Sequence, residues 1–285
     1  MGQGPSADGA HRVKTVRLLD RYSLGMKLGK GAFGEVHACT DKATNKVFAV
    51  KRISRQRSSK AEIDREVGML EKLADHPCIV KLHAVYTAID TVDLVLDLYA
   101  GGDLVTAMQH HWDNKGDIPL ASVQRLSWQI FRGVAYLHQN SVVHRDIKGE
   151  NYILDRDCLE DPETRIVLTD FGTAVEVVDV DRRLTQMIGT EQYWPPEMYA
   201  RRYSFKLDVW AAAVILYGLA SANFPFMNRG EVQNKTLQPP ARLGEHGENL
   251  LLAAFQRDEA KRISAKEARE HSFFDAVRLE AEAAE

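Results

Sequence analysis

The chain has 285 residues, of which 45% are hydrophobic and 27% are charged, and its net charge at pH 7 is −3. This length allows one large domain or two lobes, and the small net charge provides no basic field for nucleic acid, so we expect no nucleic-acid partner. The longest apolar run, Val209–Ala220, is too short to span a bilayer and predicts a buried helix. Few, scattered cysteines and no apolar stretch near the amino terminus favour a cytoplasmic location.

Residues 1–20 are expected to form a flexible tail with an acylation pattern. Met1–Ser6 fits the pattern for myristoylation of Gly2. One acyl chain needs a second signal for stable membrane attachment, and basic residues follow it: Arg12, Lys14, Arg17 and Arg21. The alternative is an ordinary disordered tail.

The segment Gly29–Val36 contains Gly29, Gly31 and Gly34. Glycines at this spacing also occur in dinucleotide-binding turns, but such a turn leads into an amphipathic helix. Here residues 35–39 alternate like a strand, a turn follows at 41–45, and 47–51 read as the next strand. A glycine-rich hairpin can close over phosphates with its backbone N–H groups. We therefore expect a phosphate-binding hairpin, with Lys51 on the adjacent strand.

Beyond this hairpin, the hydrophobic pattern changes along the chain. Ala61–Leu73 is an amphipathic run, and Thr91–Leu98 alternates as a strand. Tyr99–Asp103 then breaks the pattern, and helical periodicity dominates afterwards. The sequence thus predicts a β-rich first part with one helix and a mainly helical second part.

Residues 144–151 and the triplet Asp170-Phe171-Gly172 carry the strongest chemical signal. Phosphoryl transfer needs a carboxylate at the incoming hydroxyl, a cation near the γ-phosphate and oxygen ligands for Mg²⁺. Asp146, Lys148, Asn151 and Asp170 provide these groups at close spacing. The plain alternative is a charged surface loop, which the ordered presence of the other motifs disfavours.

With these motifs, the chain resembles the eukaryotic protein kinase family, serine/threonine type, from about Tyr22 to about Phe274. Gly189–Glu197 resembles the substrate-docking loop of the family, with Pro195 in place of its alanine, and Arg262 matches the arginine that pairs with Glu197. Asp208-Val209-Trp210 matches the start of a central helix. The segments 94–97 and 101–104 look most like the calcium/calmodulin- and cyclic-nucleotide-regulated branch.

The resemblance implies an α+β bilobal protein kinase fold, with a small β-rich N-lobe that carries one helix, αC, and a larger, mainly helical C-lobe. The expected divisions are a tail at 1–20, a kinase domain at 21–275 and an Ala/Glu-rich tail at 276–285. Within the domain we expect the N-lobe at 21–96, the hinge at 97–102 and the C-lobe at 103–275.

The resemblance also implies an ATP- and Mg²⁺-dependent protein serine/threonine kinase. Its implied catalytic residues are Asp146 as the base, Lys148, Thr190, Lys51 and the αC residue Glu66. Asn151 and Asp170 would bind Mg²⁺, and Leu96 would be the gatekeeper beside adenine. The ATP contacts would be Leu28, Gly29, Gly31, Gly34, Val36, Ala49, Lys51, Asp97, Tyr99, Asp103, Ile153 and Asp170. The rival interpretations are a pseudokinase-like ATP-binding scaffold and a small-molecule phosphotransferase of related fold.

Regulation and substrate choice are further expectations from the resemblance. Arg145 precedes Asp146, and kinases with that arginine often need a phosphate on the activation segment, where Thr185 is the leading site. Because Glu62 and Val175 occupy positions that are basic in relatives, acidic residues could replace that phosphate: Glu176, Asp179 or Asp181.

The expected partners are protein substrates with serine or threonine, bound by a monomeric enzyme. The resemblance implies that Asp103 and Glu150 face the peptide groove and favour arginine on the amino-terminal side of the target. Ribose binding is the alternative role for Asp103.

Overall fold

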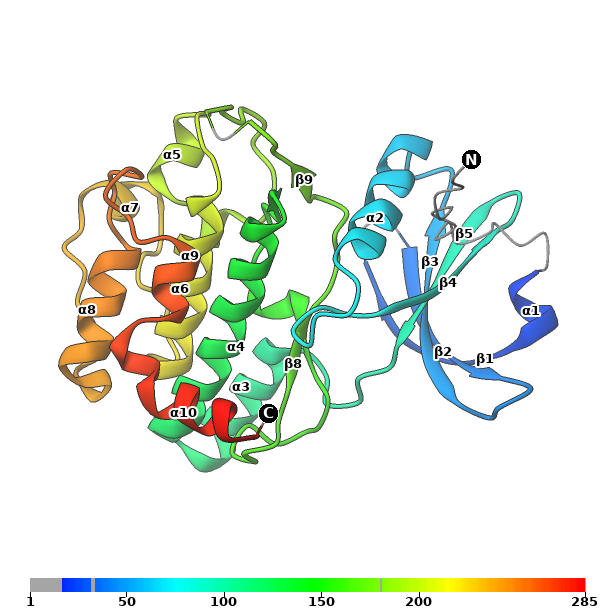
Figure 1. Cartoon of the computed structure of the whole chain (residues 1–285), viewed down its shortest axis with the longest axis horizontal. Helices are drawn as coiled ribbons and strands as arrows, with labels where there is room; N and C mark the ends of the chain where they lie inside the picture. The colour runs from blue at the N-terminus through cyan, green and yellow to red at the C-terminus, as the bar shows by residue number, and fades with distance from the viewer. Residues whose placement is uncertain (1–16, 32–33, 180, 285) are drawn as a thin grey trace, which may run out of the picture. The chain divides into compact units, whose positions relative to one another are not determined.

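The structure is a computed structural model that describes residues 17–31, 34–179 and 181–284 (Figure 1). The chain divides into two compact units. The first contains the described residues up to Val67 together with Lys81–Leu98, and the second contains Gly68–Val80 together with the chain from Tyr99 onward.

The first unit is built on one five-stranded antiparallel sheet with the order β1-β2-β3-β5-β4. Its elements are α1 (Leu18–Arg21), β1 (Tyr22–Lys30), β2 (Gly34–Asp41), β3 (Val47–Ser54), β4 (Leu82–Thr87) and β5 (Thr91–Asp97). The strands expected from the alternating segments are therefore present. The hairpin of β1 and β2 and the neighbouring strand β3 form as the sequence predicts.

The strand register separates two faces of this sheet. Lys51 on β3 lies opposite Val36 on β2 and Leu94 on β5, and Ala49 lies opposite Leu96. Because side chains alternate along a strand, these five residues share one face. The other face carries a buried cluster: Leu18, Tyr22, Cys39, Phe48, Val50, Tyr86 and Val95. The sheet thus has a core face and a face that presents Lys51.

Helix α2 (Lys60–Lys72) begins with a reciprocal cap. The backbone N–H of Ser59 donates to the Glu62 carboxylate at 2.7 Å, and the Glu62 N–H donates to the Ser59 hydroxyl at 3.3 Å. Such a capping box satisfies donors that a helix start leaves free. Ile63, Glu66 and Leu70 are buried, so the inward stripe of this amphipathic helix carries one charged residue.

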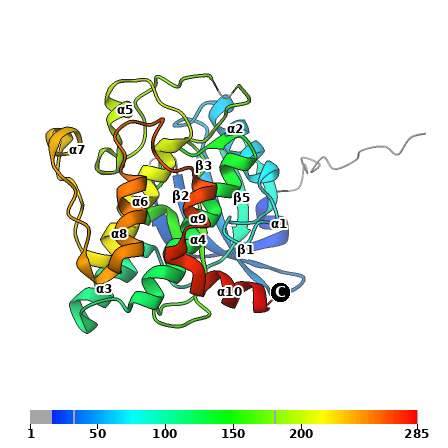
Figure 2. The same ribbon diagram turned by 60° about the vertical axis from the view of Figure 1, so that its left-hand side comes forward.

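The second unit is mainly helical. Its helices are α3 (Leu104–Lys115), α4 (Leu120–Gln139), α5 (Pro196–Tyr199), α6 (Lys206–Ser221), α7 (Arg229–Asn234), α8 (Gly244–Ala254), α9 (Ala265–Arg269) and α10 (Asp275–Ala284). Short strands pair as β6 (Val142–Val143) with β9 (Val175–Glu176), and as β7 (Tyr152–Leu154) with β8 (Ile166–Leu168). Helix α6 lies between α4 and α8 and is buried along most of its length, as expected for 209–220 (Figures 1 and 2).

The chain boundaries differ from the expected ones at three places. Residues 68–80 belong with the second unit rather than with an N-lobe of 21–96, because the Val80 N–H donates to the Leu168 carbonyl at 3.0 Å and the Leu168 N–H donates to the Cys78 carbonyl at 2.8 Å. The expected tail at 276–285 is helical through Ala284, with Val277 buried. Within the expected tail at 1–20, Leu18 is already part of the core.

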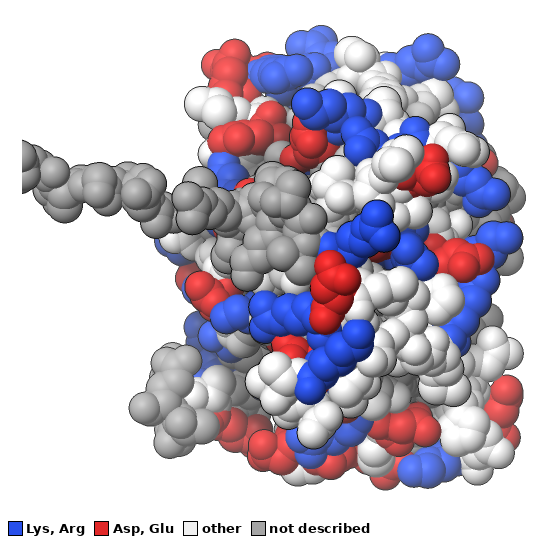
Figure 3. All heavy atoms as spheres, turned by 90° about the vertical axis from the view of Figure 1, so that its right-hand side faces the viewer, with Lys and Arg blue, Asp and Glu red and all other residues white. Residues whose placement is uncertain are grey.

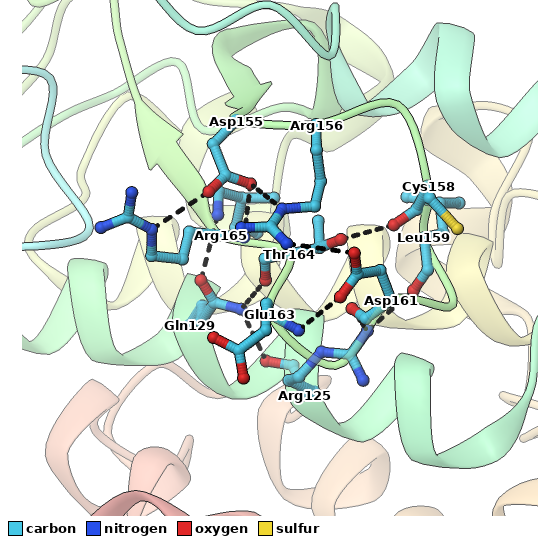
Figure 4. A network of polar contacts seen from close by, with 11 residues as sticks. Arg125, Gln129, Asp155, Arg156, Cys158, Leu159, Asp161, Glu163, Thr164 and Arg165 are labelled. Atoms are coloured by element: carbon cyan, nitrogen blue, oxygen red, sulfur yellow. Dashed lines mark hydrogen bonds and ion pairs between the residues drawn. The ribbon is translucent and has the colours of Figure 1, made fainter. Parts of the chain in front are cut away.

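The loop between β7 and β8 is held on helix α4 by a polar network (Figure 4). The guanidinium of Arg125 donates to the carbonyls of Leu159 and Asp161 at 2.8 Å each. Gln129 donates to the Thr164 carbonyl at 3.1 Å and accepts from the Ile166 N–H at 3.0 Å. These bonds fix one end of the β7–β8 hairpin, whose other end carries Asn151 and Asp170.

Basic and acidic side chains are intermixed on the face of the protein shown in Figure 3. Ion pairs within the first unit join Arg21 to Asp41 and Arg52 to Asp93, each at 2.9 Å. Within the described residues, no helix combines the length and apolar character required to cross a bilayer.

Candidate active site

In the first unit, the structure brings Lys51 and Glu66 together. The Lys51 ammonium lies 2.6 Å from the Glu66 carboxylate, and the two side chains are 15% and 6% exposed. Breaking a buried ion pair leaves one charge uncompensated, which is strongly destabilising. Glu66 therefore holds the Lys51 ammonium at the sheet face that also carries Val36 and Ala49.

The glycine-rich hairpin has one position where only glycine fits. A Cβ at Gly34 would lie 1.9 Å from the carbonyl oxygen of Arg52 on the neighbouring strand. At Gly29 and Gly31, by contrast, a Cβ would meet no heavy atom of the described residues within 4 Å. Leu28 on β1 is 46% exposed. Residues 32 and 33, at the tip of the hairpin, lie outside the described residues.

The two backbone groups expected to bind adenine belong to different units. Asp97 ends β5 in the first unit, and Tyr99 belongs to the second. The Asp97 N–H donates to the Lys81 carbonyl at 3.1 Å, and its carboxylate lies 2.7 Å from the imidazole of His83. These contacts use the backbone amide and the side chain of Asp97.

The catalytic-loop segment is anchored by Asp208, at the start of α6. This fully buried carboxylate accepts the N–H groups of His144 at 2.9 Å and Arg145 at 3.0 Å, and it lies 3.2 Å from the His138 ring. Arg145 has a φ of +69°, an uncommon conformation for a residue with a side chain. The sequence identified Asp208 only as the start of a helix. A charged residue opening an apolar helix was the signal for this anchoring role.

Asp146, Lys148 and Thr190 form a closed triangle of polar contacts. The Lys148 ammonium lies 2.9 Å from an Asp146 carboxylate oxygen and 2.9 Å from the Thr190 hydroxyl. That hydroxyl donates to the other Asp146 oxygen at 2.8 Å. Gly189, with a φ of +89°, lies so close to Arg145 that a Cβ would be 2.2 Å from its carbonyl oxygen. The docking loop can therefore approach the catalytic loop only because glycine stands at 189.

Asn151 and Asp170 lie at the same end of the β7–β8 hairpin. The Asn151 side-chain amide donates to the Asp146 carbonyl at 2.8 Å, so Oδ1 is the atom it can offer to a cation. The Asn151 carbonyl accepts from the Thr169 N–H at 2.8 Å, and Asp170 follows with a φ of +59°. Among the described residues, no group of three or more His, Cys, Asp or Glu could hold an ion by itself. These oxygen donors suit Mg²⁺, which in nucleotide sites also takes phosphate oxygens.

His144 and Phe171 support the loop rather than the chemistry. Both are fully buried, and their rings meet edge to face with centroids 5.1 Å apart. Burial lowers the pKa of His144 because the charged imidazolium would lose its water. A neutral, buried ring is suited to packing.

Asp103 has a structural role that the sequence did not reveal. It is the N-cap of α3: one carboxylate oxygen accepts the Thr106 N–H at 2.9 Å, and the other accepts the Thr106 hydroxyl at 2.7 Å. Its backbone also forms a bridge with Ile153, so these two expected ATP contacts are neighbours. An acidic residue directly before a helical run is the usual N-cap signal.

Comparison with known proteins identifies the family. The description "Protein kinase domain" matches residues 22–274. The chain is 33% identical over 268 residues to calcium-dependent protein kinase 33 of Arabidopsis thaliana, covering 88% of this chain and 49% of that protein. It is 33% identical over 272 residues to serine/threonine-protein kinase PEPKR2 of the same plant, covering 88% and 53%.

A calcium-dependent protein kinase 11 from Oryza sativa subsp. japonica is 31% identical, with 90% of this chain and 46% of that protein covered. The chain thus spans about half the length of the curated relatives that it matches. The expected fold is confirmed: an antiparallel sheet unit and a helical unit. The chain belongs to the protein kinase domain family, as its motifs indicated.

Proposed function

We propose that this protein transfers the γ-phosphoryl group of ATP to serine or threonine hydroxyls of protein substrates. The observation that carries the proposal is the triangle of Asp146, Lys148 and Thr190. It combines a carboxylate that can orient a hydroxyl and accept its proton with a cation that can offset phosphoryl charge. Catalysis of this reaction depends mostly on positioning and charge neutralisation.

The residues have distinct roles in the proposal. Asp146 accepts the proton of the substrate hydroxyl, and Lys148 lies near the transferred group. Lys51, held by Glu66, binds the α- and β-phosphates. Asn151 and Asp170 would hold Mg²⁺, whose charge would neutralise that of the phosphates. The other expected ATP contacts complete the site. Gly29, Gly31 and Gly34 would lie over the phosphates, and the adenine and ribose would contact Leu28, Val36, Ala49, Asp97, Tyr99, Asp103 and Ile153.

The same proposal covers location and attachment. We propose a cytoplasmic monomer, in keeping with the three free cysteines, two of which are buried. Gly2 lies outside the described residues, so its acylation stays a prediction. Of the basic residues that would aid membrane binding, Arg21 is paired with the buried carboxylate of Asp41 at 2.9 Å, which weakens the second signal.

Asp146→Asn tests the activity. With ATP, Mg²⁺ and a generic protein substrate, we expect kcat to fall by about 10²–10⁴-fold, because the base is lost while the side chain keeps its size. The ATP dissociation constant should change little. Asp64→Asn, on the exposed side of α2, is the matched control. ATP binding by the wild type without phosphate incorporation would favour the scaffold, and incorporation into small molecules alone would favour the related phosphotransferase.

A further inference from the structure

The guanidinium of Arg145 is held by neutral groups. Arg145 is 6% exposed, and its Nε donates to the Thr173 carbonyl at 2.7 Å. Its Nη1 donates to the side-chain oxygen of Gln186 at 3.3 Å. Among the described residues, no carboxylate lies within ion-pair distance of this guanidinium. A buried cation of this kind needs acceptors, and Gln186 supplies one from the activation segment.

Backbone contacts with Tyr203 hold the segment that carries Gln186. Leu184 and Tyr203 form an antiparallel bridge, and the Tyr203 hydroxyl donates to the Gln186 carbonyl at 2.5 Å. Thr185 and Gln186 are both exposed. Thr185 lies opposite Arg202 on the paired segment, whereas the Gln186 side chain accepts the hydrogen bond from Arg145.

Val177 and Leu184 of the activation segment are also held by contacts that need no phosphate. Val177 and Leu184 are buried in a cluster with Met198 and Tyr203. The Val177 N–H donates to the Ser141 carbonyl at 2.7 Å. These contacts are apolar or backbone contacts, and none of them needs a charged group on the segment.

The acidic residues expected to replace a phosphate do not contact Arg145. Glu176 pairs with Lys72 at 2.5 Å, and the Asp179 carboxylate accepts the N–H of Asp181 at 3.0 Å. The expectation that Glu176, Asp179 or Asp181 takes this role at Arg145 is therefore not supported by the geometry. The residue that takes it is a neutral glutamine.

We propose that Gln186 is a positioning residue that holds Arg145, and through it the catalytic loop, so that catalysis needs no phosphate on Thr185. This inference rests on the proposed function. Arg145 is bonded directly to Asp146 in the chain, and its side chain ties the loop to the segment after Asp170-Phe171-Gly172. Without Gln186, the buried guanidinium of Arg145 loses one of its hydrogen-bond acceptors. The position of Asp146, the next residue in the chain, is then less well fixed.

The first experiment separates Gln186 from Thr185 by kinetics. Enzyme treated with a phosphatase and shown by intact mass to lack phosphate is compared with Thr185→Ala, Gln186→Ala and Gln186→Glu. We expect the phosphate-free wild type and Thr185→Ala to keep kcat within about 2-fold. Gln186→Ala should lower kcat by roughly 10-fold, the effect of one hydrogen bond to a charged group, with KM values unchanged. Gln186→Glu should restore kcat because its carboxylate accepts from Arg145.

Gln233→Ala, at an exposed glutamine of α7, is the matched control and should behave as the wild type. The inference is overturned if Gln186→Ala leaves kcat unchanged, or if the phosphate-free wild type and Thr185→Ala lose activity that the phosphorylated enzyme has.

The second experiment needs no activity, so it also tests the inference if the proposed function fails. Arg182 and Arg183 are exposed trypsin sites on the activation segment. We expect phosphate-free wild type to resist cleavage there and Gln186→Ala to be cut several-fold faster at an unchanged melting temperature. Equal cleavage rates for the two proteins would contradict the role of Gln186. Loss of phosphotransfer in every form, with this difference in cleavage retained, would reject only the proposed function.

Discussion

Glu197 and Arg262 form a bidentate ion pair in the interior of the second unit. The two guanidinium nitrogens of Arg262 donate to the two carboxylate oxygens of Glu197, one of them at 2.9 Å. The arginine is fully buried, its Nε donates to the Gln256 carbonyl at 3.0 Å, and its guanidinium lies 5.0 Å from the Trp210 ring centroid. The pair fastens the docking loop to the helical core, as the sequence motifs predicted.

Arg262→Ala should therefore destabilise the protein strongly. Removing one partner of a buried ion pair leaves the other charge uncompensated, at a cost of about 3–5 kcal/mol. Arg262→Lys should recover only part of the lost stability, because an ammonium cannot form the two parallel hydrogen bonds that the planar guanidinium donates to the Glu197 carboxylate. Urea denaturation measures both, with Arg278→Ala as a more exposed arginine control. A loss below about 1 kcal/mol for Arg262→Ala would contradict the prediction.

Asp208→Asn should lower activity through the catalytic loop. The carboxylate accepts two backbone N–H groups, from His144 and Arg145. In the variant, the NH₂ of the side-chain amide faces one of these two N–H groups. That buried N–H then has no acceptor, at a cost of about 1–3 kcal/mol. We expect kcat to fall about 10-fold or more, because Asp146 follows Arg145 directly, with a smaller change in the KM for ATP. Unchanged kcat would show that the loop keeps its shape without this anchor.

Local patterns predicted much of this molecule. The alternation of 35–39 and the apolar segment 47–51 predicted the strands that lead to Lys51, and the amphipathic run 61–73 predicted a helix. These strands and this helix follow from local pattern, which depends only on nearby residues, whereas the role of Glu66 was implied by the family resemblance. The spacing around Asp146 likewise brought out Lys148, whereas Thr190, the third residue of the triangle, was implied by the family resemblance.

Contacts between distant segments were not predictable in this way. Nothing near residue 79 in the sequence shows that Ile79 bridges to Leu168, so the assignment of 68–80 was missed. Glu62 and Asp103 were interpreted through family positions, whereas each caps a helix. The partner of Arg145 is an exposed glutamine 41 residues further along the chain, and no local pattern points to it.

Glu150 should contribute more than Asp103 to recognition of arginine in the substrate. Both oxygens of Asp103 accept hydrogen bonds from Thr106, while Glu150 is exposed, with the Tyr193 hydroxyl at 3.5 Å as its contact. For a peptide pair that differs only in arginine three residues before the serine, we expect wild-type kcat/KM to change by about 10-fold. Glu150→Gln should reduce this ratio to about 3-fold or less.

Asp103→Asn is the informative companion to this variant, because asparagine caps a helix as well as aspartate but carries no charge. It should leave most of the arginine preference intact at unchanged stability. If Asp103→Asn abolishes the preference and Glu150→Gln does not, the assignment is reversed. If the wild type phosphorylates both peptides at equal rates, the predicted arginine preference is wrong.

Because of His76, we expect the protein to be less stable in mild acid than at neutral pH. Burial, aided by the positive charges of Arg132 and Arg269, lowers the pKa of His76 to about 4, and its ring stacks on Tyr136 with centroids 4.1 Å apart. The unfolded chain has a histidine pKa near 6.5, so between about pH 6.5 and 4 the unfolded state binds the extra proton. The stability contributed by the neutral ring is complete above pH 6.5 and is lost as the pH falls towards 4.

His76→Asn tests this assignment. Asparagine does not titrate, and its side-chain oxygen can accept the Cys78 N–H that His76 Nδ1 accepts at 3.2 Å. Urea unfolding at a series of pH values should give a smaller fall in unfolding free energy between pH 6.5 and 4.5 for this variant than for the wild type. His110→Asn, at an exposed histidine of α3, should follow the wild-type curve. Parallel curves for wild type and His76→Asn would mean that other groups carry the acid sensitivity.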